Sequence, residues 1–309
     1  MNKYFKIIFS LAVIVTLFSC AKEDDNPVSK PRDYVEQYAK DIDSINKFID
    51  THSMAVDAEF NVTYTEIPAN GPETSIREQT QYPLQFKTVT NVAHKVDYKI
   101  YYIVLNEGVG QRPTAVDSIH VSYRGVETVK GDQFDFAQNP VWFRTDDLVA
   151  GWSEILPYFK TGNYDPTDGP NPVNFSDYGA GIMFLPSGMG YFNLSQGTLT
   201  AYANLVFSFK LFELKYRDHD GDKILSKDEV PVGSDFLYDP QDYDSDADGI
   251  PNYFDVDDDN DRVLTKRELK KPDGTYHTFE TVPGCDGLAT NPARVRRYLD
   301  PACKPPFAN

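Results

Sequence analysis

The feature that most constrains this chain is a dense run of acidic residues in its last third. Residues 218–268 contain 17 acidic and 5 basic side chains and so contribute −12 of the formal charge of −17. At this density, carboxylates in a compact structure repel one another strongly unless a cation lies between them. The run is therefore either a solvated acidic tail or a segment organised around metal ions. The spacing of its carboxylates favours the second interpretation, a segment that binds metal ions.

Three stretches of this run place carboxylates at positions 1, 3, 5 and 12 of a twelve-residue loop, the spacing that wraps hard oxygen ligands around Ca²⁺. The predicted ligands are Asp218, Asp220, Asp222 and Glu229 in the first loop, Asp244, Asp246, Asp248 and Asp255 in the second, and Asp257, Asp259, Asp261 and Glu268 in the third. Position 7 would contribute a backbone carbonyl, and position 9 a side chain that acts directly or through water. These positions are Ile224, Ile250 and Val263, and Ser226, Asn252 and Thr265.

The loops depart from standard EF-hands. Only the middle loop has glycine at position 6, where the others have Lys223 and Arg262. The first loop follows a predicted strand, and the second runs almost directly into the third, a close pair that resembles the calcium-binding repeats of thrombospondin type 3. Residues 217–309 are therefore predicted to form a loop-rich extension in which Ca²⁺ is structural, because sensors need helix pairs that open.

The N-terminus predicts export. Residues 1–19 have the layout of a lipoprotein signal peptide, in which Lys3 and Lys6 precede an apolar run too short for a comfortable membrane span. The run ends in LFSC, which resembles a bacterial lipobox with Cys20 as the lipidated residue. An ordinary signal peptide with a chance cysteine is the alternative.

Residues 20–32 are predicted to be an acidic tether and linker. The sequence AKEDD after Cys20 resembles the tag that sends some outer-membrane lipoproteins to the cell surface, although a solvated tether explains it nearly as well. The proline-containing NPVSKPR suits a linker. Together these features predict a protein of the cell envelope, anchored to the outer membrane by lipid.

Residues 33–97 are predicted to form an N-terminal helix and strand region. From Asp33 to about Asp50, apolar residues recur every three or four positions, as in an amphipathic helix. They are Val35, Tyr38, Ile42, Ile45 and Ile49. The segments EFNVTYTEI and LQFKTVT then have strand-like composition, separated by turn-rich pieces.

Aromatic and acidic residues recur in an unusual order between Asp117 and Trp152. An alternating run of Ile119, Val121 and Tyr123 is typical of a half-buried strand. The sequences GDQFDF and LVAGW follow, and the second joins two aliphatic residues to an indole across small residues. Their side chains are predicted to line one apolar cleft.

Residues 98–216 resemble the FK506-binding-protein (FKBP) type of peptidyl-prolyl cis-trans isomerase. The resemblance rests on YKI, GVG, VSYRG, GDQFDF, LVAGW, LPSGMGYF and the final ANLVFSFKLFEL. It implies an α+β fold in which a strongly bent antiparallel sheet wraps over one short helix, here Gly151 to Phe159. It also implies that proline-containing segments of exported proteins are the substrates.

The resemblance also implies a set of site residues. The catalytic residues would be Tyr123, Phe134, Asp135, Trp152, Tyr191 and Phe207, with Phe143, Leu148, Val149 and Leu199 binding substrate. Trp152 would form the floor, the aliphatic and phenyl groups would grip the proline ring, and Asp135 and Tyr191 would orient the peptide. The chain departs from the family at Val141, where an aromatic is common, and in residues 193–202, which lack the usual prolines. The long Lys160–Tyr178 loop could cap the cleft.

Such a site needs no nucleophile and no catalytic cofactor. Rotation of an X-Pro bond passes through a twisted amide, across a barrier of about 18–20 kcal/mol. A water-poor aromatic cleft favours this less polar state, and a millionfold acceleration requires only about 8 kcal/mol of differential binding. The sequence therefore predicts an isomerase. A non-catalytic binding module or chaperone that uses the same cleft is the alternative.

Two further expectations follow from composition. The strong negative charge excludes nucleic acid as a partner, because phosphate binding needs a basic face. With Cys20 assigned to lipid, Cys285 and Cys303 remain, and in an exported protein this pair predicts one disulfide. Two free thiols are the competing interpretation.

Overall fold

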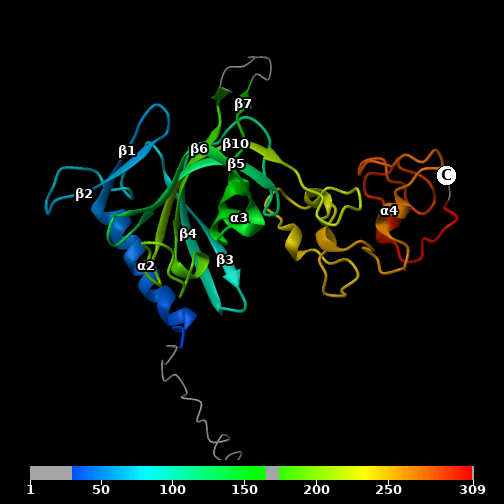
Figure 1. Ribbon diagram of the computed structural model, residues 1–309, viewed down its shortest axis with the longest axis horizontal. Helices are drawn as coiled ribbons and strands as arrows, with labels where there is room; N and C mark the ends of the chain where they lie inside the picture. Colours follow the sequence, from blue (N-terminus) through cyan, green and yellow to red (C-terminus); the bar gives the residue numbers. More distant parts are fainter. Residues whose placement is uncertain (1–29, 165–173, 308–309) are drawn as a thin grey trace, which may run out of the picture. The chain divides into compact units, whose positions relative to one another are not determined.

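The structure is a computed structural model that describes residues 30–164 and 174–307 (Figure 1). Contacts divide the chain into residues 1–32 and Asp33–Asn309, and all the elements below lie in the second unit. The predicted signal peptide and Cys20 lie outside the described residues. In the described part of the chain, no helix has both the length and the apolar character needed to cross a membrane.

The apolar spacing after Asp33 corresponds to helix α2, Tyr34–Thr51. Asp33 caps it by accepting hydrogen bonds from the amides of Val35 and Glu36. The helix leads into a hairpin of β1 (His52–Val56) and β2 (Val62–Glu66).

A six-stranded antiparallel sheet forms the centre, in the order β3-β4-β9-β10-β5-β6. Its strands are β3 (Leu84–Asn91), β4 (Val96–Asn106), β5 (Ser118–Glu127), β6 (Gln133–Arg144), β9 (Gly179–Leu185) and β10 (Leu205–Lys215). Neighbours in the sheet pair antiparallel throughout. The predicted α+β class with an antiparallel sheet and few helices is confirmed.

Alternation along the strands gives the sheet two apolar faces. In β4, Ile100 and Tyr102 belong to the cluster that contains Trp152 of helix α3, whereas Tyr101 and Ile103 belong to the cluster that contains Ile45 of α2. The sheet is therefore covered by α3 on one face and by α2 on the other.

The helix expected over Gly151–Phe159 is shorter than predicted. The α-helix α3 covers Gly151–Ile155 and continues as a 3-10 turn, η2, over Leu156–Tyr158. Pro157 has no amide hydrogen and so cannot make the helical bond to the carbonyl four residues earlier. Proline therefore ends the α-helix here.

Between η2 and β9 lies a short hairpin of β7 (Asn163–Tyr164) and β8 (Phe175–Ser176). The tip of the long loop, residues 165–173, lies outside the described residues. At the base of the hairpin, the Phe175 ring lies 5.0 Å from that of Phe212. None of the described residues of this hairpin lines the aromatic cleft described below.

After β10 the chain has turns and short helices but, within residues 217–307, no strand. Its helical turns are η4 (Ser226–Asp228), η5 (Pro240–Asp242), η6 (Asn252–Phe254), α4 (Thr265–Glu268) and η7 (Arg297–Leu299), and η1 (Thr145–Asp147) and η3 (Ser187–Met189) occur earlier. A small core of Ile224, Leu269, Val282 and Tyr298 holds the segment together.

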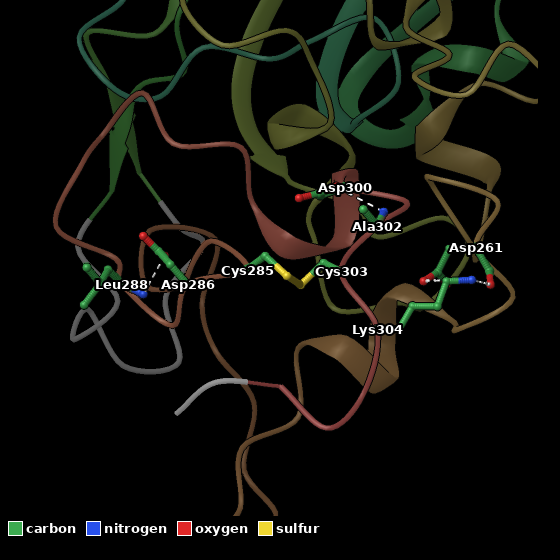
Figure 2. Close-up of a disulfide and its surroundings, with 8 residues drawn as sticks. All are labelled: Asp261, Cys285, Asp286, Leu288, Asp300, Ala302, Cys303 and Lys304. Atoms are coloured by element: carbon green, nitrogen blue, oxygen red, sulfur yellow. Dashed lines mark hydrogen bonds and ion pairs between the residues drawn. A yellow bond between two sulfur atoms is a disulfide. The ribbon is translucent and has the colours of Figure 1, made fainter.

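The predicted disulfide between Cys285 and Cys303 is present, with the two Cα atoms 5.3 Å apart (Figure 2). Beside the cysteines, Asp286 accepts a hydrogen bond from the amide of Leu288, and Asp300 accepts one from the amide of Ala302. The cross-link thus joins two turns that carboxylates already fix locally.

Candidate functional site

An aromatic cleft of about 270 Å³ lies between the helix α3 and the strands β5, β6 and β10. It is lined by Tyr123, Asp135, Phe143, Asp147, Leu148, Val149, Trp152, Tyr191 and Phe207. Sequence analysis predicted every one of these residues except Asp147. The structure thus brings together side chains that are up to 84 residues apart in the chain.

Two predicted residues lie behind the cleft rather than in its lining. Phe134 packs edge-on against Phe207, with ring centroids 5.5 Å apart. Leu199 is buried in the core cluster on the same face of the sheet. Both support the lining residues from behind. Asp147 was missed because it ends η1, and its only sequence signal is its position next to Leu148.

The irregular pairing of β5 and β6 sets the direction of the side chains that line the cleft. Register shifts occur between Val121 and Tyr123 and between Gly125 and Val126, and such bulges bend a strand and redirect its side chains. A Cβ atom on Gly125 would lie 2.5 Å from Cζ of Phe134. Glycine at this position therefore makes room for the phenyl ring that supports the cleft.

Trp152 forms the floor. Its side chain is 3% exposed, and its ring lies 5.2 Å from that of Phe207 and 5.8 Å from that of Tyr123. The Tyr123 ring meets it at 84°, the edge-to-face arrangement that aromatic pairs prefer. This packing keeps the floor rigid and apolar.

The polar groups of the cleft are few and fixed. The Tyr123 hydroxyl donates a 2.7 Å hydrogen bond to the Asp135 carboxylate. Burial, and then this carboxylate, raise the pKa of Tyr123. Burial and the Asp135 charge likewise raise the pKa of Tyr191. Both hydroxyls therefore stay protonated at neutral pH. Tyr123 uses its hydrogen for the bond to Asp135, whereas the Tyr191 hydroxyl can donate to a peptide.

Helix α2 holds the wall that carries Tyr191, a connection that sequence analysis did not predict. Asp41, buried in this helix, accepts hydrogen bonds from the amide (2.9 Å) and the hydroxyl (2.6 Å) of Ser187. Tyr34 stacks at 4.0 Å on Phe192, just beyond Tyr191. A signal did exist, because Asp41 lies three residues after Tyr38 and four before Ile45, on the apolar face of the helix.

Two of the larger surface hollows differ from this cleft, although the second of them shares Tyr123 with it. One, of about 610 Å³, is bordered by β1 and by the polar residues Thr74 and 78–81. The other, of about 480 Å³, lies between Phe60 and Phe136. Neither combines a buried indole with the apolar lining of the cleft over Trp152, so the smaller cleft is the better candidate for binding a proline ring.

The acidic loops form a second candidate site. Within each loop, the carboxylates of positions 1, 3 and 5 offer oxygens within 4.8 Å of one another. The three loops also share one hydrogen-bond pattern: the position-1 carboxylate accepts from the position-6 amide, and the position-5 carboxylate from the position-7 amide. The spacing thus produces the same backbone turn three times.

That turn requires an unusual backbone at position 6. Lys223, Gly249 and Arg262 have φ values of 94°, 96° and 74°. Side chains other than glycine rarely adopt this left-handed conformation. The first and third loops therefore adopt the turn despite their residue at this position.

Positions 9 and 12 are arranged less uniformly than positions 1, 3 and 5. The position-9 side chains accept hydrogen bonds from the position-2 amides, as Ser226 does from His219. At position 12, Asp255 and Glu268 belong to none of the ligand groups found among the described residues. Glu229 lies with Asp222 and with Asp258 of the third loop.

The environment of these carboxylates fits a cation. Burial, and then the neighbouring carboxylates, raise the pKa of Glu229 to about 11 and those of Asp258 and Glu268 to about 9. Several of their oxygens are buried without a hydrogen-bond partner in the described structure. A hard cation stabilises such oxygens in the ionised state.

Comparison with known proteins gives a match to a curated isomerase. The chain is 29% identical over 126 residues to the FKBP-type peptidyl-prolyl cis-trans isomerase FkpA of Aeromonas hydrophila, which covers 40% of this chain and 41% of that protein. The chain thus spans less than half the length of this relative. The match supports a relationship to FKBP-type isomerases.

Solved structures and a family model also match. A peptidyl-prolyl cis-trans isomerase of Pseudomonas syringae pv. tomato has a TM-score of 0.35 at 18% identity, covering 60% of this chain and 99% of that one. FkpA of Escherichia coli has a TM-score of 0.36 at 18% identity, covering 70% and 74%. Both TM-scores indicate only a distant similarity in structure. The family described as BamM C-terminal matches residues 219–292, which contain the first acidic loop without Asp218, the whole second and third loops, and Cys285.

Proposed function

We propose that the chain is an FKBP-type peptidyl-prolyl cis-trans isomerase that acts on X-Pro bonds of exported proteins. The observation that carries the proposal is the cleft over Trp152, a buried indole surrounded by aromatic and aliphatic side chains with one ordered carboxylate. Sequence similarity to an isomerase of this type supports it independently.

In the proposed mechanism the protein binds the twisted amide better than the planar one. The proline ring packs on Trp152, and Leu148 and Val149 exclude water from it. The twisted amide has lost its resonance and is less polar, so an apolar surface favours it. The Tyr191 hydroxyl donates to a peptide carbonyl and holds the chain in the turn that leads to rotation. No covalent intermediate forms.

The two tryptophans provide a matched test. Trp152 forms the floor, whereas Trp142 is 39% exposed and stacks on His120 outside the cleft. Trp152→Phe removes part of the floor and loses an aromatic contact worth about 0.5–1.5 kcal/mol beyond its area. We expect kcat/KM on a proline peptide to fall about tenfold, and Trp142→Phe to leave it unchanged.

Turnover is measured by a protease-coupled proline-peptide assay, and folding is checked by circular dichroism. If the unaltered protein does not accelerate isomerisation, the enzyme proposal fails. If it binds unfolded proline-rich clients, and Trp152→Phe weakens that binding without any turnover to lose, the chain is the alternative, a binding module or chaperone of the cell envelope.

We also propose that residues 217–309 bind Ca²⁺ as a structural ion. Ca²⁺ would lie within the three groups of carboxylates at positions 1, 3 and 5, whose oxygens match its ligand preference. Chelation should then lower the melting temperature and expose residues after Tyr216 to protease. Calorimetry without a heat of Ca²⁺ binding would remove this proposal.

Location at the outer membrane through lipid on Cys20 is proposed from the LFSC sequence. Radiolabelled palmitate should enter the unaltered protein and not a Cys20→Ser variant. A Cys20→Ser protein that still carries the label, or an unaltered protein without it, would argue for an ordinary signal peptide.

A further inference from the structure

Three carboxylates from two different loops converge in the acidic segment. Asp222 and Glu229 belong to the first loop, and Asp258 belongs to the third. Each offers an oxygen within 4.8 Å of the other two, and their exposed fractions are 2%, 2% and 1%. This group is more deeply buried than the group of the second loop, in which Asp244 and Asp246 are half-buried and Asp248 is exposed.

These carboxylates have no protein partner that explains their burial. Both oxygens of Glu229, both of Asp258 and Oδ2 of Asp222 find no hydrogen bond among the described residues. The nearby Lys266 ammonium donates to the carbonyl of Gly221 instead. Buried carboxylates are ordinarily paired with cations or hydrogen-bonded, so a cation would satisfy this cluster in its ionised form.

The backbone directs Asp258 toward the first loop. Asp258 occupies position 2 of the third loop, between the ligand positions Asp257 and Asp259. Thr265 accepts its amide hydrogen, and the Ser245 hydroxyl donates to its carbonyl at 2.5 Å. The corresponding residues of the first and second loops are His219 and Ser245. At position 2, therefore, only the third of these loops has a carboxylate.

We propose that Asp222, Glu229 and Asp258 bind a divalent hard cation of the Ca²⁺ class that links the first acidic loop to the third. The ligands are all oxygens, which favours hard cations over the soft and borderline metals that prefer sulfur or nitrogen. Asp222 also belongs to the first loop's own group, with Asp218 and Asp220. The two cations would therefore share this side chain.

The linking cation would make the acidic segment cooperative. The first loop begins two residues after Tyr216, and the third precedes the small core that contains Leu269. The ion would therefore connect both ends of the three-loop region. This inference rests on the proposed Ca²⁺ binding of the segment and does not depend on isomerase activity.

The test uses the full chain with Asp258→Asn, and Asp242→Asn as a control that removes one exposed carboxylate of the same segment. Ca²⁺ binding is counted by titration calorimetry, and melting temperatures are measured in Ca²⁺ and in chelator. Asp258→Asn should bind one ion fewer than the unaltered protein and lose part of the Ca²⁺-induced rise in melting temperature. The control should keep both.

The measurement in chelator separates a ligand from a structural residue. Without Ca²⁺, Asp258→Asn replaces a buried acid that has no hydrogen-bond partner among the described residues with a neutral side chain of similar size, so its melting temperature should equal or exceed that of the unaltered protein. A variant that melts lower in both conditions would overturn the inference, because Asp258 would then stabilise the fold itself. So would an unchanged number of bound ions. An unaltered protein that binds no Ca²⁺ would instead refute the calcium proposal as a whole.

Discussion

Replacing Asp41 with alanine should both destabilise the protein and slow catalysis, although Asp41 lies outside the cleft. Its carboxylate fastens helix α2 to the turn at Ser187, four residues before Tyr191. Without it, the turn loses its main anchor. The wall of the cleft that carries Tyr191 should then move away from its binding position.

The size of the effect follows from the hydrogen bonds. A bond to a charged acceptor contributes about 1.5–3 kcal/mol. Asp41 accepts one from Gln37 of its own helix and two from Ser187, and only the two from Ser187 link the helix to the turn. The Ser187 amide keeps a 3.2 Å bond to Asn204 in the variant. The loss of folding free energy therefore lies near the lower end of the range for two such bonds, at about 3 kcal/mol. The higher helix propensity of alanine returns about 0.5 kcal/mol. The resulting change of about 2.5–3 kcal/mol lowers Tm by about 5–12 °C for a domain of this size.

Asp43→Ala is the matched control, because Asp43 is exposed on the same helix and gains the same propensity. Tm is measured by calorimetry, and turnover at a temperature at which both variants are fully folded. We expect Asp41→Ala to lose several-fold in kcat/KM and Asp43→Ala to lose nothing. If the two variants melt alike, the anchor has no energetic role. If Asp41→Ala melts lower but retains full turnover per folded molecule, the anchor does not position Tyr191.

Three further outcomes are expected. Gly125→Ala should abolish most turnover in a folded protein, because the new Cβ would lie 2.5 Å from the Phe134 ring; unchanged kcat/KM would contradict the assigned packing. Arg262→Gly should stabilise the Ca²⁺-loaded protein by about 0.5–1 kcal/mol by relieving its positive φ, and Gly249→Ala should do the opposite; melting curves with the reverse order would refute this. Reduction of the disulfide, with a sequence separation of 18, should cost about 3 kcal/mol and make residues 217–307 sensitive to protease; equal cleavage rates would show that the small core suffices.

Features set by local sequence were the ones that could be predicted. The alternation in Leu205–Lys215, the apolar spacing of α2 and the repeated carboxylates each act over a few residues and correspond to β10, a helix and three similar turns. The cleft lining was predicted from motifs of a resembling family. The α3 helix was predicted too long because the effect of Pro157, a purely local signal, was not taken into account.

The connections between distant segments could not be predicted, and they are the features that make the two sites specific. Asp41 and Ser187 are 146 residues apart, and nothing near either residue specifies the other. Asp258 occupies position 2, which the spacing of the loop does not mark as a ligand position. Its carboxylate nevertheless lies beside those of Asp222 and Glu229 in the first loop. Asp41 and Asp258 are both buried acids that pack against a distant segment of the chain. A buried carboxylate stays ionised only if hydrogen-bond donors or a cation lie next to it. For Asp41 the donors are on Ser187, and for Asp258 no protein donor is found in the described chain. The same physical requirement therefore makes Asp41 a structural anchor and supports the proposal that Asp258 is a ligand.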